Sequence, residues 1–251
     1  MKLTQNTILI TGGTSGIGRS LAEAFHARQN NVIIAGRRQQ HLDEITKLNP
    51  GMIGLRLDVT DQKSIEGFAG EVRERFPELN VLINNAGISR SENYTAELVD
   101  VTTAMAILQT NVMSVVELTA ALLPVLRAQP HATLMATSSG LAFVPMAGYP
   151  TYCASKAFLH SWLEAIRFQL RETSVEVLEL IPPYVQTELG GARQASDPRA
   201  MPLAAFTAEV MTIIEEGKAE RGEILVENVL PLRWAEKNGQ YEHLLTALGT
   251  S

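Results

Sequence analysis

The sequence predicts one α/β domain, in which helices cover both faces of a doubly wound parallel sheet. Short apolar runs alternate with stretches of helical periodicity along the 251 residues, and this alternation is typical of a parallel sheet covered on both faces. No repeat, low-complexity segment or Gly/Ser-rich linker divides the chain. We therefore expect a single domain over residues 1–251, long enough to bury a substantial core.

The first strand–helix unit carries the clearest motif. Residues 7–10 form an apolar run that predicts a buried strand, and residues 19–26 have a helical pattern. Between them, residues 11–18 read T-G-G-T-S-G-I-G. A glycine turn in this context predicts a dinucleotide site, because glycine lets the backbone approach a pyrophosphate and the helix N-terminus offers free N–H groups. Glycines that serve only to pack a tight turn are the alternative.

The later elements follow in the same alternating order. We expect further strands at residues 32–36, 53–57, 81–84, 132–138, 175–181 and 223–226. We expect further helices at residues 38–48, 62–76, 99–128, 151–173, 204–217 and 233–247. Residues 188–203 contain two glycines and two prolines and break the alternation. A mobile substrate lid is expected there, with a plain surface loop as the alternative.

Tyr152 and Lys156 are the most informative pair of side chains. They are four residues apart in a helix-compatible stretch and therefore share one face. A free phenol titrates near pH ~10, so acid–base use at pH ~7 requires a shift of about three units, roughly 4 kcal/mol. A positive charge at ~4 Å supplies up to about that much at an effective dielectric of ~20. The spacing also arises by chance in many helices, so its meaning depends on the other motifs.

Together these motifs resemble the short-chain dehydrogenase/reductase family, and further matches follow in the family's order. Asp58 and Val59 follow the third apolar run, residues 84–87 read N-N-A-G, Asn111 lies in the long helix, and Ser139 precedes Tyr152 by thirteen residues. The resemblance covers about residues 5–190. Residues 139–146 and the pair Pro182-Pro183 further resemble the branch associated with teichoic-acid D-alanylation operons, which does not establish a substrate.

The resemblance implies a Rossmann-type sheet of about seven strands and an oxidoreductase activity. Hydride would move between a nicotinamide and a carbonyl or alcohol carbon of a small molecule. The apolar run 141–146 and Tyr149 could line a pocket for a hydrophobic substrate, although ordinary core packing explains them nearly as well. A nucleotide-binding regulatory or scaffold protein without turnover is the alternative function.

The resemblance assigns the reacting centre to four residues. Tyr152 would exchange a proton with the substrate oxygen. Lys156 would lower the pKa of Tyr152, together with the charge of the oxidised nicotinamide, and would hold the nicotinamide ribose. Ser139 would hydrogen-bond the substrate oxygen, with Ser138 as the competing choice and a backbone cap as the alternative role. Asn111 would support a water that links Lys156 to solvent, or would simply be a polar residue that bends its helix.

The cofactor site is expected to combine the glycine turn, the ends of the next three strands, the catalytic pair and the segment after the sixth strand. The implied cofactor-binding residues are Gly12, Thr14, Ser15, Gly16, Ile17, Gly18, Arg37, Arg38, Asp58, Val59, Asn85, Ala86, Gly87, Tyr152, Lys156, Pro182, Val185 and Thr187. Where the family commonly has Pro-Gly, Pro183 fixes φ and removes an N–H donor. Tyr184 is then either held towards the substrate or covers the sheet edge.

The end of the second strand indicates which cofactor is bound. NAD enzymes usually place an acid there to hold the ribose 2′-hydroxyl, whereas this chain has Gly36, Arg37 and Arg38. Guanidinium groups bind a 2′-phosphate through charged hydrogen bonds. The family's other basic NADP residue is missing, because that position is Ser15. NADP is therefore expected and NAD remains possible; two solvated arginines at the start of a surface helix are the alternative.

Composition excludes several other classes. With 45% hydrophobic and 19% charged residues the chain reads as an ordinary soluble protein, and a net charge of −6 argues against a nucleic-acid surface. No apolar run has the length of a membrane span, and no signal peptide is recognisable. Cys153 is the only cysteine, so a reducing cytoplasm is expected. The five histidines lack metal-ligand spacing, so no metal is expected. Family resemblance and the long helices at 99–128 and 151–173 predict a homodimer or homotetramer.

Overall fold

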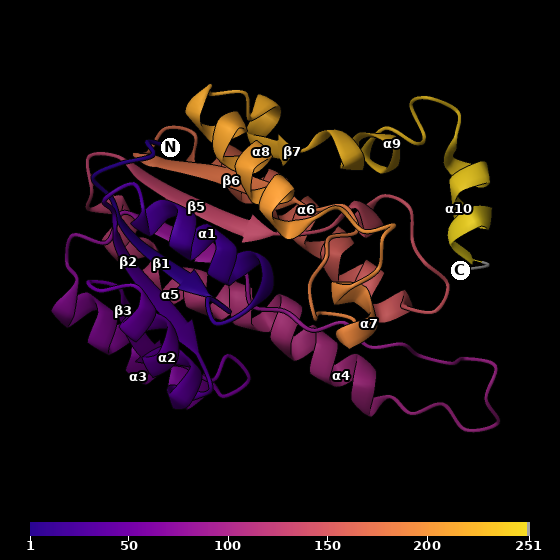
Figure 1. Ribbon diagram of the computed structural model, residues 1–251, viewed down its shortest axis with the longest axis horizontal. Coiled ribbons are helices and arrows are strands. Elements are labelled where there is room, and N and C mark those ends of the chain that lie inside the picture. Colours follow the sequence, from indigo (N-terminus) through magenta and orange to yellow (C-terminus); the bar gives the residue numbers. More distant parts are fainter. Residues whose placement is uncertain (250–251) are drawn as a thin grey trace.

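The computed structural model describes residues 1–249 and contains a seven-stranded, fully parallel sheet. The strand order is β3-β2-β1-β4-β5-β6-β7 (Figure 1). The strands are β1 Thr7–Thr11, β2 Asn31–Gly36, β3 Ile53–Arg56, β4 Val81–Asn84, β5 Ala132–Thr137, β6 Val175–Ile181 and β7 Glu223–Leu225. The predicted α/β sheet is confirmed, with each strand within two residues of its expected bounds.

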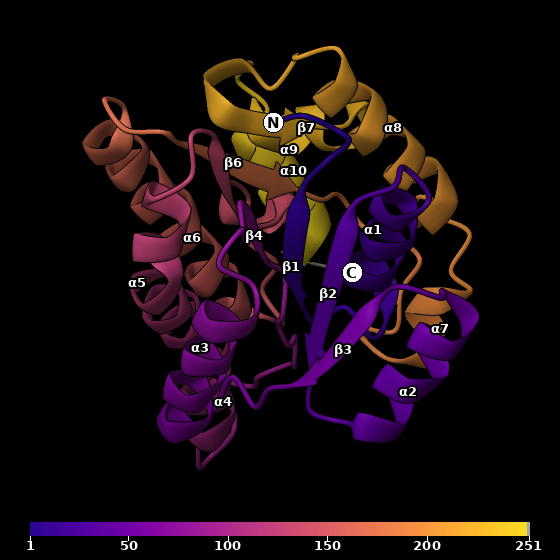
Figure 2. The same cartoon turned by 90° about the vertical axis from the view of Figure 1, so that its left-hand side faces the viewer.

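Helices cover the sheet on both faces, as Figure 2 shows. One layer contains α1 Gly16–His26, α2 Gln39–Leu48 and α8 Leu203–Glu215. The other contains α3 Gln62–Arg75, α4 Thr102–Leu108, α5 Ser114–Arg127 and α6 Pro150–Leu170. Three short helices, α7 Ala192–Ala195, α9 Leu230–Arg233 and α10 Tyr241–Gly249, follow β6.

The central strands are apolar throughout because both of their faces are buried. In β1, Ile8 and Ile10 pack into the core beneath α1 and α8, while Leu9 packs into the core beneath α3 and α5. All three side chains have no exposed surface. Successive strand residues point to opposite faces, so a doubly covered parallel strand reads as a continuous apolar run.

The structure corrects two expected helices. The predicted helix at 99–128 begins at Thr102 and contains a π-helical turn, Gln109–Met113. The predicted single helix at 233–247 is wrong, because α9 ends at Arg233 and α10 begins at Tyr241. Gly239 lies between them with φ of 65°, a left-handed conformation that interrupts helical geometry.

One helical stretch, Thr102–Arg127, is long and apolar enough to cross a membrane by length and composition alone. Half of its most apolar part is buried inside the fold, and Leu118 and Leu122 of α5 belong to the core beneath the sheet. The stretch therefore has the features of a core helix.

The topology brings the predicted site residues to one edge of the sheet. The chain moves outward from β1 to β3 and then returns to β4, which pairs with β1 on its other side. In such doubly wound sheets, ligands bind at the carboxyl ends of the strands near this reversal. The glycine turn after β1, the arginines after β2, Asp58, the N-N-A-G segment, Ser139 and residues 182–187 all follow carboxyl ends of strands.

Candidate active site

The glycine turn fits closely against the segment that follows β4. Gly12 has φ of 66°, and a Cβ atom there would lie 2.9 Å from Ala86 Cα and 3.1 Å from Asn85 Nδ2. Gly16 has φ of 51°, and its Cβ position would face Thr187 Cγ2 at 3.4 Å. Only glycine combines this backbone conformation with this closeness. The turn therefore lies between the segments after β4 and β6, which is the cradle that a pyrophosphate requires.

Hydrogen bonds accepted by Thr11 connect the glycine turn to the segment after β4. Its hydroxyl accepts from the backbone N–H groups of Asn85 and Ala86 at 3.0 and 3.1 Å. The Asn85 amide donates to the Thr11 carbonyl at 3.2 Å, and its oxygen accepts from Thr137 at 3.3 Å. Helix α1 then begins at Gly16, with Ser15 as its N-cap and no side chain capping its first turn. Its free N–H groups and positive dipole end suit an anionic phosphate.

Three arginines surround the end of β2. Arg37 and Arg38 are exposed, and neither forms an ion pair with any residue that the structure describes. Arg56, which sequence reasoning missed, lies opposite Gly36 in the register of β2 and β3. Its position two residues before Asp58 was a usable signal. Unpaired guanidinium groups at this position suit a phosphate better than a hydroxyl.

Asp58 is held as a carboxylate at the end of β3. Burial raises its pKa, but hydrogen bonds from the Thr60 backbone and hydroxyl outweigh burial, and Arg37 and Arg56 add positive charge. The net effect lowers the pKa of Asp58. A carboxylate that can accept hydrogen bonds is therefore present at the end of β3.

Helix α6 carries Tyr152 and Lys156 on its buried face. Both side chains are nearly inaccessible, and Lys156 Nζ lies 5.8 Å from the centroid of the Tyr152 ring. The ammonium donates to the Thr137 carbonyl at the end of β5 at 2.8 Å. The predicted pair therefore meets the end of β5, next to the N-N-A-G segment.

Ser139 and Ser138 point to different partners. The Ser139 hydroxyl lies near enough to the Tyr152 phenol to lower its pKa, and it accepts a hydrogen bond from the backbone N–H of Leu141 at 3.1 Å. Ser138 instead donates to the buried Glu179 carboxylate at 2.5 Å. The geometry thus places Ser139 beside Tyr152, as the spacing predicted, while its alternative role as a backbone cap is also observed.

Burial is the largest influence on the protonation of Tyr152 and Lys156 in the protein alone. It raises the pKa of Tyr152 to about 12, against the neighbouring Ser139 hydroxyl, which lowers it. It lowers the pKa of Lys156 to about 8, against the negative charge of Glu179 that raises it. The expected depression of the pKa of Tyr152 by Lys156 is not seen in the protein alone, where the loss of solvation is the largest influence on this pKa.

Asn111 lies fully buried in the π-helical turn between α4 and α5. Its Oδ1 accepts from the Ile88 backbone N–H at 2.9 Å, and its Nδ2 donates to the Ile88 carbonyl and to Ser155 Oγ. A Cβ at Gly87 would lie 3.3 Å from Asn111 Oδ1 and 3.7 Å from Lys156 Nζ. Gly87 therefore leaves space between the two side chains, and the π turn, a feature frequent at functional sites, directs Asn111 inward.

The segment after β6 returns to the glycine turn. Val185 is buried and forms a parallel bridge with Met201, and Thr187 faces Gly16. The Pro182 carbonyl accepts from the Gly140 N–H at 2.9 Å, which links this segment to the Ser139 turn. Tyr184 is half exposed and donates to Asp197 at 3.3 Å, so its hydroxyl contacts residues 188–203.

Residues 188–203 are anchored by side chains at several points. Gln194 donates to the Val185 carbonyl at 2.8 Å and to the Thr187 hydroxyl at 3.2 Å. The Asp197 carboxylate binds the Arg199 guanidinium at 2.7 Å. The segment is therefore attached to Val185 and to Thr187, and Thr187 in turn faces Gly16 of the glycine turn.

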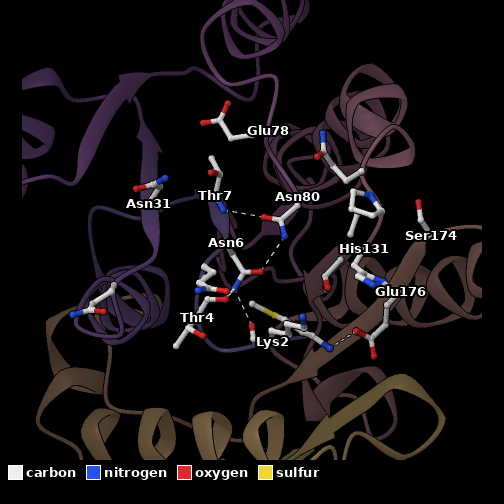
Figure 3. Close-up of a pocket in the computed structure, with 17 residues that line it drawn as sticks. Lys2, Thr4, Asn6, Thr7, Asn31, Glu78, Asn80, His131, Ser174 and Glu176 are labelled. Atoms are coloured by element: carbon white, nitrogen blue, oxygen red, sulfur yellow. Dashed lines mark hydrogen bonds and ion pairs between the residues drawn. The ribbon is translucent and has the colours of Figure 1, made fainter.

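A separate polar cavity of about 690 Å³ opens at the amino ends of the strands (Figure 3). Asn80 accepts there from the Thr7 backbone at 2.9 Å and donates to Asn6 at 3.0 Å. These side chains satisfy each other and the strand backbone. Because parallel strands carry the predicted site at their opposite ends, this cavity is not part of it.

Comparisons with known proteins agree with this geometry. A family model described as short chain dehydrogenase matches residues 6–198. The chain is 37% identical to "Uncharacterized oxidoreductase DltE" of Bacillus subtilis, over 100% of this chain and 99% of that protein. It is 31% identical to an NADP-dependent 3-hydroxy acid dehydrogenase of Schizosaccharomyces pombe, over 78% of each chain.

Solved structures share the fold. A short chain dehydrogenase from Burkholderia cenocepacia in complex with NADP has a TM-score of 0.81 at 22% identity and covers 97% of this chain and 98% of its own. A short chain dehydrogenase/reductase from Burkholderia phymatum in complex with NAD has a TM-score of 0.77 at 23% identity, covering 96% of each chain. At these identities the similarity shows the fold, and it leaves the choice between NAD and NADP to the residues of this chain.

Proposed function

Because the chain belongs to the short-chain dehydrogenase family and is thus an NAD(P)-dependent oxidoreductase, we propose that it uses NADP to reduce or oxidise a small hydrophobic carbonyl or alcohol substrate. The observation that carries the proposal is the meeting of Ser139, Tyr152 and Lys156 at the carboxyl edge that also holds the glycine turn. A protein that only bound nucleotide would have no need of a buried proton donor there.

A bound nicotinamide would supply or accept the hydride. Residues of the chain would transfer the proton and orient the substrate oxygen. Tyr152 holds its proton at neutral pH, and burial raises its pKa further, to about 12; it can therefore donate that proton to a carbonyl oxygen during reduction. The Ser139 hydroxyl, which lies near that phenol, orients the same oxygen where negative charge develops. Lys156 places a positive charge 5.8 Å from the Tyr152 ring, which stabilises the phenolate left after transfer.

The three arginines at the end of β2 support NADP as the cofactor. A 2′-phosphate would meet the guanidinium groups of Arg37, Arg38 and Arg56, whereas no carboxylate is present at Gly36 to hold a 2′-hydroxyl. The relative from Schizosaccharomyces pombe is named as NADP-dependent, in agreement with this proposal.

The substrate pocket is proposed to lie against residues 141–146 and Tyr149. Leu141, Phe143 and Met146 are only partly buried and follow Ser139 directly. Apolar side chains at the entrance favour a hydrophobic carbonyl compound. Residues 188–203, anchored beside Thr187, are proposed as the segment that covers the bound substrate.

We further propose a homodimer or homotetramer located in the cytoplasm. Met105, Leu108, Met113, Phe158 and Phe168 are exposed on α4, the π turn and α6, whereas Leu118 and Leu122 serve the core and are unavailable for association. An apolar surface of this kind favours contact between subunits. Sedimentation at micromolar protein concentration should show a dimer or tetramer, and a monomer there would reject the association.

The experiment that tests the function is a panel of aldehydes, ketones and alcohols, followed by the nicotinamide absorbance with NADPH and NADH in parallel. We expect turnover of hydrophobic carbonyl compounds, with NADPH preferred. Binding of NADP without turnover of any compound would favour the alternative, a nucleotide-binding regulatory protein.

A further inference from the structure

A fully buried carboxylate, Glu179 of β6, lies directly beneath the proposed site. Its side chain has no exposed surface. One oxygen accepts from the Ser138 hydroxyl at 2.5 Å, and the other lies 2.8 Å from His160 Nδ1. His160 follows Lys156 by one turn of α6. Both oxygens are therefore occupied, one by the strand that leads into Ser139 and one by the helix that carries Lys156.

His160 also contacts the far end of the turn that carries Ser139. Its ring meets the Phe143 ring edge-on, with centroids 4.8 Å apart and an interplanar angle of 74°. Ser138 is bound by Glu179 and Phe143 by His160, so one hydrogen-bonded pair holds the segment 138–143 at both ends. Ser139 lies between these two contacts.

A second ion pair closes the cluster from the C-terminal side. Arg233 of α9 binds both oxygens of Glu223 at 2.6 and 2.8 Å, and Glu223 lies opposite Glu179 in the register of β6 and β7. The Arg233 guanidinium also lies 4.6 Å from the centroid of the Phe143 ring. Phe143 is thus bordered by His160 and Arg233, each paired with a buried carboxylate.

The charges of this cluster act on Lys156 and His160. The negative charge of Glu179 raises the pKa of Lys156 against the effect of burial. The hydrogen bond to Glu179 raises the pKa of His160, with burial opposing and with the charges of Glu164 and Glu223 adding to the rise. The remaining charged and titratable groups around the cluster are Arg233 on α9, Arg221 beside Glu164, and Tyr152 beside Lys156.

We propose that Glu179 and His160 form a clamp that positions Ser139 and keeps Lys156 charged. Glu179 and His160 are then positioning residues for the proposed reaction. The clamp acts through Ser138 and Phe143 on the Ser139 turn, and through the charge of Glu179 on Lys156. It rests on the proposed oxidoreductase function of the same site.

A metal site is the competing interpretation, because ligand atoms of His160, Glu164 and Glu223 lie within 4.8 Å of one another. Both oxygens of Glu223 are bound by Arg233, and His160 Nδ1 is bound by Glu179. An arginine beside the carboxylate would also repel a cation. The contacts favour a closed ionic cluster.

The test compares Glu179→Gln and His160→Gln with the control Glu176→Gln, an exposed carboxylate on the same strand. The Glu179→Gln side chain can still bond Ser138 and His160 but lacks the charge. One limb of the pH profile of kcat/KM should reflect the loss of the Lys156 proton. Because Glu179→Gln removes the negative charge that raises the pKa of Lys156, we expect this limb to move to lower pH in that variant only. We expect kcat in His160→Gln to fall by up to about 10²-fold, as for a misplaced reacting group, with NADP affinity at pH 6 unchanged. The control should match the wild type.

An unmoved limb in Glu179→Gln would overturn the clamp, whatever the change in kcat, because a purely structural role lowers the active fraction equally at every pH. A limb moved to lower pH in His160→Gln would also contradict it, because that variant keeps the carboxylate. If Glu179→Gln does not fold, Phe143→Leu replaces it: kcat should fall while the substrate KM and the limb stay in place. An unchanged kcat, or a change in KM alone, would reject the clamp.

A nuclear magnetic resonance titration of His160 in the cofactor-free protein separates failure of the clamp from failure of the proposed function. The resonance is assigned by its loss in His160→Gln. Its pKa should lie above the ordinary histidine value in the wild type and fall in Glu179→Gln. An ordinary pKa in the wild type overturns the clamp even if the enzyme is active, and a raised pKa supports the pair even if the substrate panel shows no turnover.

Discussion

The two halves of the carboxyl edge of the sheet are built in different ways. On the β1–β4 side, backbone groups meet backbone groups: Gly12 approaches Ala86, and Thr11 fixes the segment after β4. On the β5–β7 side, charged side chains hold the segments, as Glu179 holds Ser138 and Glu223 holds Arg233. The difference indicates that the proposed cofactor side depends on short glycine-rich motifs, whereas the proposed substrate side is assembled by contacts between distant residues.

The largest expected effect comes from removing the Tyr152 hydroxyl, which should affect turnover but leave cofactor binding intact. Tyr152→Phe should lower kcat by about 10²–10⁴-fold, the usual contribution of general acid–base catalysis, because only the transferable proton is lost. NADP affinity should persist, since the glycine turn and the arginines are untouched. Steady-state kinetics with a parallel NADP titration measures both, and near-normal turnover of a folded Tyr152→Phe protein would refute the assignment.

The buried Lys156 should lower the free energy of unfolding, although it takes part in the proposed reaction. Burial lowers the pKa of Lys156 to about 8 in the folded protein, whereas the ordinary pKa of lysine is 10.5. Between these values the unfolded chain binds more protons, so the free energy of unfolding rises with pH. Above pH 10 ionisation of Tyr152 in the unfolded chain opposes the rise, because its folded pKa is about 12.

Lys156→Met should therefore be more stable than the wild type at pH 7, by an amount on the order of 3 kcal/mol at about 1.4 kcal/mol per pKa unit, and should lose the rise between pH 8 and 10. Urea denaturation across this range measures both effects. The exposed Lys47 offers a control, since Lys47→Met should change stability by no more than about 0.5 kcal/mol. Equal behaviour of the two variants would contradict the effect of burial.

Arg37→Ala should weaken NADP binding by about tenfold to more than a hundredfold and leave NAD binding nearly unchanged. A hydrogen bond to a charged group contributes roughly 1.5–3 kcal/mol, and about 1.4 kcal/mol corresponds to tenfold. Both cofactors should be titrated at fixed ionic strength, with Arg127→Ala at the end of α5 as the control. Equal losses for both cofactors would show that Arg37 supports the site generally, and tighter NAD than NADP binding in the wild type would reject the NADP assignment.

A change of cofactor preference needs two substitutions. Gly36→Asp supplies an acceptor for the ribose hydroxyl, but any Cβ at this position would lie 2.9 Å from Thr14 Cγ2. Gly36→Asp alone should therefore weaken both cofactors. Adding Thr14→Ser removes that methyl group and should shift the preference towards NAD; the same two titrations would show an unshifted preference if the interpretation is wrong.

The smallest effect is expected at the segment 188–203. Arg199→Ala removes the partner of Asp197, which also receives the Tyr184 hydroxyl at 3.3 Å. Because Arg199 itself is exposed, the substrate KM should rise only severalfold, with NADP affinity and kcat unchanged. A change in NADP affinity as large as that in KM would show that the segment serves the cofactor rather than the substrate.

Most of the fold, and the position of most candidate site residues at one edge of the sheet, could be predicted from the sequence. Apolar runs located all seven strands, and the thirteen-residue spacing placed Ser139 rather than Ser138 beside Tyr152. Sequence reasoning missed Arg56, because its closeness to Gly36 depends on strand register. It also missed the break between α9 and α10, since an isolated glycine does not reveal its own φ.

The sequence by itself determined the alternating strands and helices, the glycine turn and the one-turn separation of Tyr152 and Lys156, because each depends on residues close together in the chain. Only the tertiary structure decided that burial raises the pKa of Tyr152, and that Thr14 obstructs position 36. It also decided that Glu179, 41 residues after Ser138, holds the end of β5. Desolvation and packing depend on what surrounds a side chain, and those neighbours come from segments that only the folded chain brings together.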